Sequence, residues 1–167
     1  NPYNNLGIAY AETSDFLEAK INYDKAIKLN KNYTDAYLNR GISLNKLKKY
    51  DEAISDIKLV LKAEPLNAKA FNSLGNVFKS TKLFDKAIKS YERAINIQPN
   101  YLEAIRNKAL IYFEQKKYKE SLICLNKIYE KDPSFKGTIE SIIFNKMHIF
   151  EWSDLNKYKE EIKKKFF

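Results

Sequence analysis

Hydrophobic and polar residues alternate with the spacing of an amphipathic helix over more than the first 130 residues of the chain. Large apolar residues return at offsets of three and four, which is the periodicity of one buried helix face. Only 4 glycines and 4 prolines occur among the 167 residues, and this favours long helices joined by short turns over a β-sandwich or barrel. The chain is therefore predicted to be all-α.

The helical pattern also repeats itself every 34 residues, without a gap. Small residues return at two positions of each repeat, as Gly7, Gly41, Gly75 and Ala109, and as Ala19, Ala53, Ala87 and Ser121. A proline returns at Pro65, Pro99 and Pro133. A period of this length is typical of a helix-turn-helix repeat. We therefore expect eight helices in four pairs, over residues 1–33, 34–67, 68–101 and 102–135.

Each recurring position has a physical reason. The first small residue lies on the first helix of a pair and the second on its partner, because only Gly, Ala or Ser fits where two helices cross closely. A junction proline cannot continue the preceding helix and is pre-set to start the next. The large residues that fill the interface are Tyr3, Tyr37, Phe71 and Ile105, then Tyr10, Leu44, Phe78 and Tyr112, then Tyr23, Ile57, Tyr91 and Leu125.

This pattern resembles the tetratricopeptide repeat family. The Leu-Gly pairs (Leu6-Gly7 and Leu74-Gly75), the aromatics, the alanines and the terminal prolines stand where the family has them. The departures are Arg40 and Lys108 in place of Leu, Ser121 in place of Ala, and Lys31 in place of Pro. The resemblance covers residues 1–135. It implies a right-handed α-solenoid of four helix pairs with a concave groove lined by the first helices.

Residues 136–167 leave the 34-residue register but still read as helical. Carried forward, the Gly position falls on Ile143 and the Ala position on Leu155, and neither permits a close helix crossing. We expect one helix over 136–150 and a second one after an N-cap at Ser153, with acids early and lysines late. These helices are predicted to cap the solenoid, with Trp152 packed against the last pair.

The segment KMHIFEWSD, residues 146–154, resembles the junction between repeats and catalytic region in O-linked N-acetylglucosamine transferase-like proteins of the SPINDLY type. Lys146-Met147 and Trp152-Ser153-Asp154 match that junction in order and spacing, whereas Phe150-Glu151 depart from it. The chain also begins at Asn1 without a methionine, inside a helical pattern. We therefore expect a fragment, and the resemblance implies a parent chain that continues into a nucleotide-sugar-dependent glycosyltransferase domain.

Amide side chains recur at the sixth position of the first helices, as Asn5, Asn39, Ser73 and Asn107. This column is expected to face the concave groove, where amides hydrogen-bond both N–H and C=O groups of an extended peptide. The neighbouring groove residues are Asn4, Asn72, Asn76, Asn45, Lys69 and Arg106. The column resembles the asparagine ladder of the same transferases. The alternative is that the abundance of Asn in this chain produces the recurrence.

A different family site is disfavoured by the residues present. Family members that bind the acidic tails of chaperones use a carboxylate clamp of Lys, Asn, Asn, Lys and Arg at set groove positions. The corresponding residues here are Asn4, Ile8, Asn39, Lys69 and Ser73, so two of five match. We therefore expect a protein or an extended peptide as partner, but not such a tail.

The sequence offers little for catalysis. His148 and Cys124 are the only residues of their kinds, which excludes a paired-His metal site and a zinc cluster. There is no Gly-rich phosphate loop. Cys124 stands amid apolar residues of a second helix, so a packed thiol is favoured over a Cys124/His148 nucleophile pair. We predict no active site, no cofactor and no metal in this fragment.

A net charge of +9 raises nucleic acid as a partner. The densest cations are Lys82, Lys86, Lys89 and Arg93, a stripe on the second helix of the third repeat. That helix is expected to face outward, and the aromatics are committed to the core, so a solvated face is favoured over nucleic-acid binding.

The chain contains a single cysteine and shows neither a membrane-spanning run nor a signal-peptide pattern. These features predict a soluble cytoplasmic protein. An array cut at its N-terminus exposes core-facing surface on the first helix, which leaves self-association through that end open. A peptide-binding scaffold is thus the favoured function, followed by the substrate-recruiting arm of a glycosyltransferase and then by nucleic-acid binding.

Overall fold

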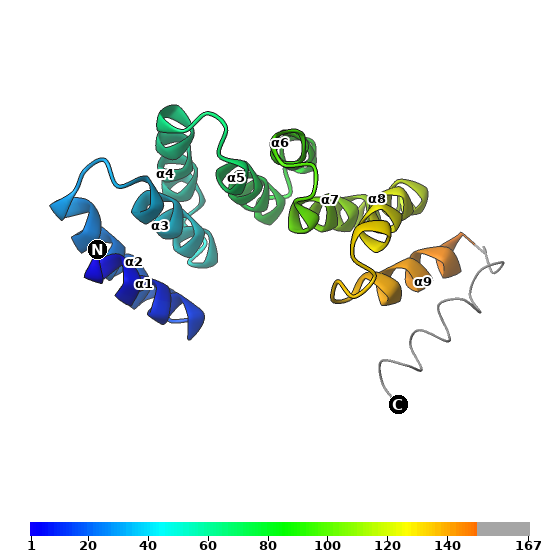
Figure 1. The fold of residues 1–167 in the computed structure, drawn as a ribbon, viewed down its shortest axis with the longest axis horizontal. Helices are drawn as coiled ribbons and strands as arrows, with labels where there is room; N and C mark the ends of the chain where they lie inside the picture. The colour runs from blue at the N-terminus through cyan, green and yellow to red at the C-terminus, as the bar shows by residue number, and fades with distance from the viewer. Residues whose placement is uncertain (150–167) are drawn as a thin grey trace. The chain divides into compact units, whose positions relative to one another are not determined.

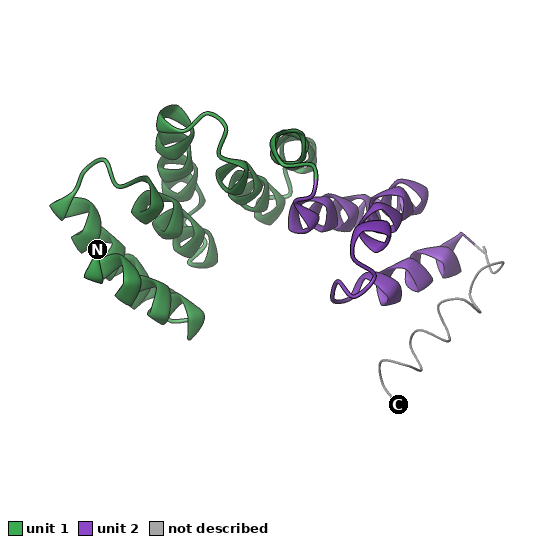
Figure 2. Cartoon of the chain, viewed as in Figure 1, with its two compact units in different colours: residues 1–99 green, residues 100–167 purple. Residues whose placement is uncertain are grey.

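The computed structural model describes residues 1–149 (Figure 1). The described chain is helical and contains no strand, so the all-α prediction is confirmed. Its helices are α1 (Pro2–Glu12), α2 (Phe16–Leu29), α3 (Thr34–Lys46), α4 (Tyr50–Ala63), α5 (Ala68–Ser80), α6 (Phe84–Ile97), α7 (Leu102–Glu114), α8 (Tyr118–Lys131) and α9 (Thr138–His148). They form two compact units, residues 1–99 and residues 100–167, of which the second is described to residue 149 (Figure 2).

The turn inside each helix pair has one residue in the left-handed backbone conformation. These residues are Ser14, Lys48, Lys82 and Lys116, with φ between 58° and 64°. The conformation lets the following N–H turn back to the helix, as where the Lys49 N–H donates to the Leu44 carbonyl at 2.8 Å. Lys82 is therefore in a turn before α6, so the predicted four-residue stripe has only three members on that helix.

The junction prolines end helices but do not start them. Pro65 and Pro99 each lie two residues beyond the last residue of α4 and α6. The next helix begins three residues after the proline, and at α5 it begins with an Asn67 cap whose Oδ1 accepts a hydrogen bond from the Ala70 N–H at 2.8 Å. The predicted role at the start of the next helix is thus filled by other residues, with Asn67 providing the N-cap at α5.

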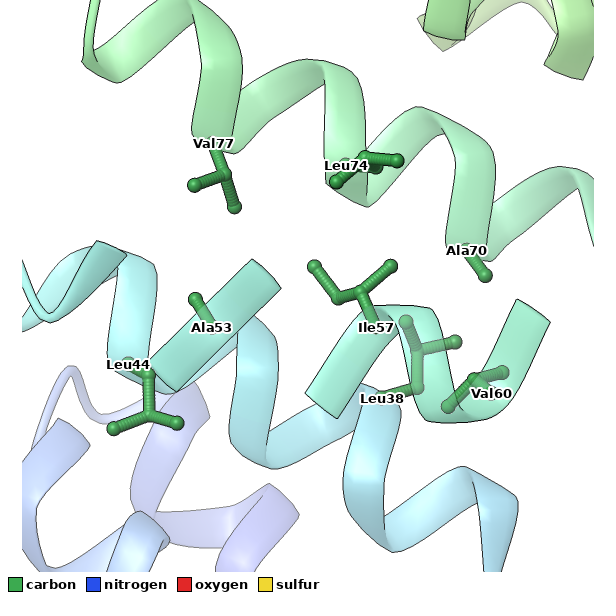
Figure 3. Close-up of a cluster of buried hydrophobic side chains, with 8 residues drawn as sticks. All are labelled: Leu38, Leu44, Ala53, Ile57, Val60, Ala70, Leu74 and Val77. Carbon is green, nitrogen blue, oxygen red and sulfur yellow. The ribbon is translucent and has the colours of Figure 1, made fainter. Parts of the chain in front are cut away.

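The core of the first unit is continuous across neighbouring pairs. Figure 3 shows Ala70, Leu74 and Val77 of α5 directed at the apolar face of α4. Ile57, at the centre of that face, is fully buried. The complete cluster is Leu38, Leu44, Ala53, Ile57, Val60, Ala70, Leu74 and Val77. Helices α3, α4 and α5 are thereby held as one packed body, and the polar faces of the first helices have a rigid base.

The close crossings predicted from the small residues are present. A Cβ built on Gly75 would lie 2.5 Å from the Tyr91 ring, and one on Gly7 would lie 2.5 Å from the Tyr23 ring. No side chain fits at that distance, so the ring fills the space that glycine leaves. Tyr91 also donates a hydrogen bond from its hydroxyl to Asn76 Oδ1 at 2.8 Å.

The second unit consists, over its described residues, of the pair α7 and α8 with α9 packed on α8. Helix α9 lies within the range predicted for the first capping helix, and its Ile139 and Ile142 are buried. The predicted second capping helix, its Ser153 cap and the packing of Trp152 fall on residues outside the described part of the chain.

Candidate functional site

The four column residues differ widely in exposure. Asn5 on α1 is exposed and Asn39 on α3 is half-buried, whereas Ser73 on α5 and Asn107 on α7 are only 5% and 9% exposed. Equal spacing along the sequence therefore does not give these four side chains equal exposure. Replacing the buried members would disturb packing as well as any partner contact.

A hydrogen bond between two amides joins neighbouring first helices. The Asn39 Nδ2 donates to Asn4 Oδ1 at 3.2 Å, and Asn4 is only 5% exposed. The bond fixes the orientation of the Asn39 side chain and satisfies a buried acceptor on α1. Asn4 is thus a supporting residue rather than the surface contact that its position suggested.

The other predicted groove residues also differ in exposure. Lys69 is exposed, Asn45 is half-buried and Asn72 is 8% exposed. Asn76 uses its Oδ1 to accept the Tyr91 hydroxyl. Asn5 and Lys69 are therefore the exposed members of the predicted set in the first unit.

The first unit has a charge network that sequence reasoning did not find. Arg40 donates from Nε and Nη2 to the two carboxylate oxygens of Asp56 at 2.7 Å each, and from Nη1 to Asp24 Oδ1 at 2.6 Å. Lys20 completes the network by a 2.7 Å contact with Asp24. Arg40 stands where the repeat family has Leu, and this departure was the available signal.

The network shifts the pKa values of Arg40 and Asp24. Asp56 is 5% exposed. Two carboxylates raise the pKa of Arg40 above its usual value, mainly through the hydrogen bonds that Arg40 donates to Asp56. For Asp24, burial alone raises the pKa, but hydrogen bonds from Lys20 and Arg40 outweigh it and bring the pKa below 3.8. Both shifts favour the charged forms of Arg40 and Asp24.

Arg106 of the second unit has different surroundings. Its guanidinium lies over the Phe135 ring at 5.4 Å, and its Nε is buried without a hydrogen-bond partner among the described residues. Arg106 lines a pocket of about 450 Å³ together with residues of α7, α8 and α9. Arg106 is the one lining residue that was predicted to contact a partner. The others include Ser121 of α8 and two residues of α9, Phe144 and Asn145, and α9 lies outside the repeat register.

The remaining sequence candidates occupy structural positions. The His148 Nδ1 lies 2.8 Å from the Phe144 carbonyl oxygen, and the ring stacks among Phe113, Tyr118 and Phe144. Cys124 is half-buried on α8. Lys86 and Arg93 of α6 are exposed and lie over the Phe78 and Phe71 rings. Among residues 1–149, no helix is both long and apolar enough to cross a membrane.

Comparison with known proteins gives partial relatives and full-length structural neighbours. Human RNA polymerase II-associated protein 3 is 37% identical over 82 residues, which is 46% of this chain and 12% of that protein. The MamA structure aligns with a TM-score of 0.76 at 23% identity, over 98% of this chain and 93% of MamA. YrrB, described as a TPR protein with an unusual peptide-binding site, aligns with a TM-score of 0.66 at 21% identity, over 94% and 81%.

Family profiles agree with the helix pairs of the structure. Tetratricopeptide repeat profiles match residues 1–33, 22–55, 68–101 and 102–135. These ranges cover α1 to α3, the first residues of α4, and α5 to α8, which together are most of the chain. The chain therefore belongs to the tetratricopeptide repeat family.

Proposed function

We propose that the chain is a non-catalytic scaffold that binds extended segments of partner proteins along the first-helix face of its repeats. Tetratricopeptide repeats are protein-interaction modules, and YrrB carries a peptide-binding site on the same fold. Because the chain spans 12% of the human relative's length, the interaction is assigned to the repeats and not to a larger activity.

The observation that carries the proposal is the pair of amides on α1 and α3. Asn5 is exposed, and Asn39 is oriented by its bond to Asn4, which leaves the Asn39 Oδ1 without a hydrogen-bond partner among residues 1–149. Neighbouring amides with a free acceptor and free donors match the alternating N–H and C=O groups of an extended main chain. Such contacts anchor a segment without selecting its side chains.

A direct test begins with a random twelve-residue peptide library displayed on phage and selected on the immobilised full chain. Affinities of the selected peptides are then measured by fluorescence anisotropy for wild type, N5A and N39A. Loss of two main-chain hydrogen bonds should weaken binding about tenfold, since each contributes about 0.5–1.5 kcal/mol. The matched control is N96A, which removes an exposed amide from the second helix α6.

The outcomes separate binding from folding. N5A removes an exposed side chain and should leave stability unchanged, whereas N39A strands the buried Asn4 acceptor and should also lower the melting temperature. Weaker binding by both variants and not by N96A supports the proposal. If the library yields no binder, or if N5A binds as tightly as wild type, the amide pair is not the contact surface.

A further inference from the structure

The pocket of the second unit is lined by the residues that correspond, one repeat later, to a tyrosine-filled helix crossing in the third repeat. In that repeat the Tyr91 ring fills the space beside Gly75, and its hydroxyl bonds to Asn76. The residues 34 positions later are Ala109, Leu110 and Leu125. They carry neither the ring nor the polar pair, and all three line the pocket of about 450 Å³.

The remaining walls make this an apolar recess. Phe113 of α7 and Phe144 of α9 line it, with their ring centroids 5.5 Å apart. Leu110 and Phe144 are 40% and 51% exposed, so the recess is open to a partner. A cavity of about 150 Å³ holds benzene, and ligand pockets run from about 300 to 1,000 Å³. The recess therefore has room for a large apolar side chain and the peptide groups beside it.

Polar atoms without partners gather around the same recess. Asn145 is 2% exposed, and its Nδ2 donates to the Ser141 carbonyl at 2.7 Å while its Oδ1 has no partner among the described residues. The Ser121 Oγ and the Arg106 Nε are also buried and have no hydrogen-bond partner within residues 1–149, and all three residues line the pocket. Buried polar atoms normally find partners. A bound peptide group would supply an N–H to Asn145 and a C=O to Arg106.

The charge beside the recess favours an acidic neighbour. Arg106 and Lys136 line the pocket together with one acid, Glu140. Unlike Arg40, Arg106 has no ion pair within the described part of the chain; its contact there is with the Phe135 ring. A guanidinium held by an aromatic ring keeps its donors available for a carboxylate.

We propose that the α7–α8–α9 pocket is a specificity pocket for a partner segment in which an aromatic or leucine side chain stands next to an Asp or Glu. The apolar side chain enters the space that Tyr91 occupies in the third repeat. The adjoining peptide group meets Asn145, and the acid faces Arg106. This inference rests on the proposed peptide-binding function and adds the side-chain preference that the amides of the first unit do not provide.

The test uses the blocked peptide Gly-Ser-Gly-Asp-Phe-Gly-Ser-Gly, titrated into ¹⁵N-labelled full chain. Amide shifts of residues 106–113 and 140–148 report binding at the pocket. Replacing the probe's Phe by Ala should weaken binding at least about tenfold, because the ring is the group that leaves water. Replacing its Asp by Lys should weaken binding about threefold, with the difference shrinking at high salt.

Two variants of the protein close or reduce the pocket by different routes. A109G/L125Y rebuilds the third-repeat crossing and places a ring in the recess, and it should abolish the preference for Phe over Ala. F144A truncates a half-exposed wall and should reduce that preference without threatening the fold. The matched control is M147A on the same helix, which is 44% exposed and does not line the pocket.

Each result of these experiments either supports or overturns the pocket proposal. Loss of the Phe preference in F144A and A109G/L125Y, with its retention in M147A, supports the pocket. If library-selected peptides bind but wild type does not distinguish Phe from Ala, this inference fails while the scaffold proposal stands. If no peptide binds at all, both fail. If sedimentation shows a wild-type dimer that F144A abolishes, and the Phe probe causes no shifts, a second copy fills the pocket and the inference is overturned.

Discussion

The two arginines of the first helices show how the two units differ. Arg40 donates hydrogen bonds to Asp56 and Asp24, and these ion pairs connect α3 to α4 and α2. Arg106 lies over Phe135 at the edge of an open pocket. One repeat scaffold therefore presents the same side chain as a structural tie in one unit and as an available charge in the other.

The helix crossings of the third and fourth repeats also differ, one being filled by a side chain and the other bordering a pocket. The third repeat closes its crossing with the Tyr91 ring against Gly75. In the fourth repeat, Ala109 and Leu125 stand at those positions and line open space. A helix crossing whose space is filled and whose polar groups are hydrogen-bonded within the protein stabilises the fold. A crossing with unfilled space and unpaired polar groups can bind a partner that fills that space and pairs those groups.

The largest expected effect comes from breaking the Arg40 tie. R40L installs the family residue but leaves the buried Asp56 carboxylate without its cation, which should lower the free energy of unfolding by about 3–5 kcal/mol. Urea denaturation followed by circular dichroism measures it. R40L/D56A removes the stranded charge and should recover much of the loss. Equal stability of R40L and wild type would show that the network contributes nothing.

A smaller loss of stability is expected from adding a methyl group at the helix crossing where the Tyr91 ring packs against Gly75. G75A puts a Cβ 2.5 Å from the Tyr91 ring, and overpacking of this kind costs about 1–3 kcal/mol. G75A/Y91L imitates the Ala109 and Leu125 pair of the fourth repeat, so the two changes should be less damaging together than their sum. Additive losses in a double-mutant cycle would mean that Gly75 and Tyr91 are not coupled.

Periodicity sufficed to predict the helices of the repeats and the close crossings. Gly75 and Ala87 recur with their equivalents at fixed spacing, and the structure places each where two helices meet. The left-handed turn residues were not predictable in the same way. Lys48, Lys82 and Lys116 adopt a conformation that sequence rules assign to Gly or Asn, because packing of the flanking helices fixes the turn.

The candidate site was predicted less well than the fold. The spacing predicted Asn5 and Asn39, of which Asn5 is exposed and Asn39 half-buried. It also included Asn4 and Asn76, whose amides bond within the protein. Which amide of a pair faces solvent depends on the helix rotation and on a neighbour about 34 residues away. The pocket was missed because it depends on α9, where the repeat register ends, and on Leu125, which reads as ordinary core.

The Arg40 network also predicts a pH dependence confined to acid. The pKa of Asp24 in the folded protein lies below its usual 3.8, so folding favours its ionised form. The contribution to stability is present above about pH 4 and is lost as the pH falls through the folded pKa. Asp24 is partly exposed, which limits the change to about 0.2–1 kcal/mol. The D24N variant should lose this part of the pH dependence in urea titrations from pH 6 to pH 2.

A substitution at Arg106 should have a small effect on stability, and it tests the contrast between the two arginines most directly. R106Q gives up a cation–π contact worth about 0.5–1 kcal/mol and strands no buried carboxylate of the described residues, because none of these is paired with Arg106. Its unfolding midpoint should stay close to that of wild type, while binding of the Asp-Phe probe weakens and loses its salt dependence. R106K retains the charge and should restore the salt dependence in part. A loss of stability as large as that of R40L would show that Arg106 is also a structural tie, and the contrast between the two units would not hold.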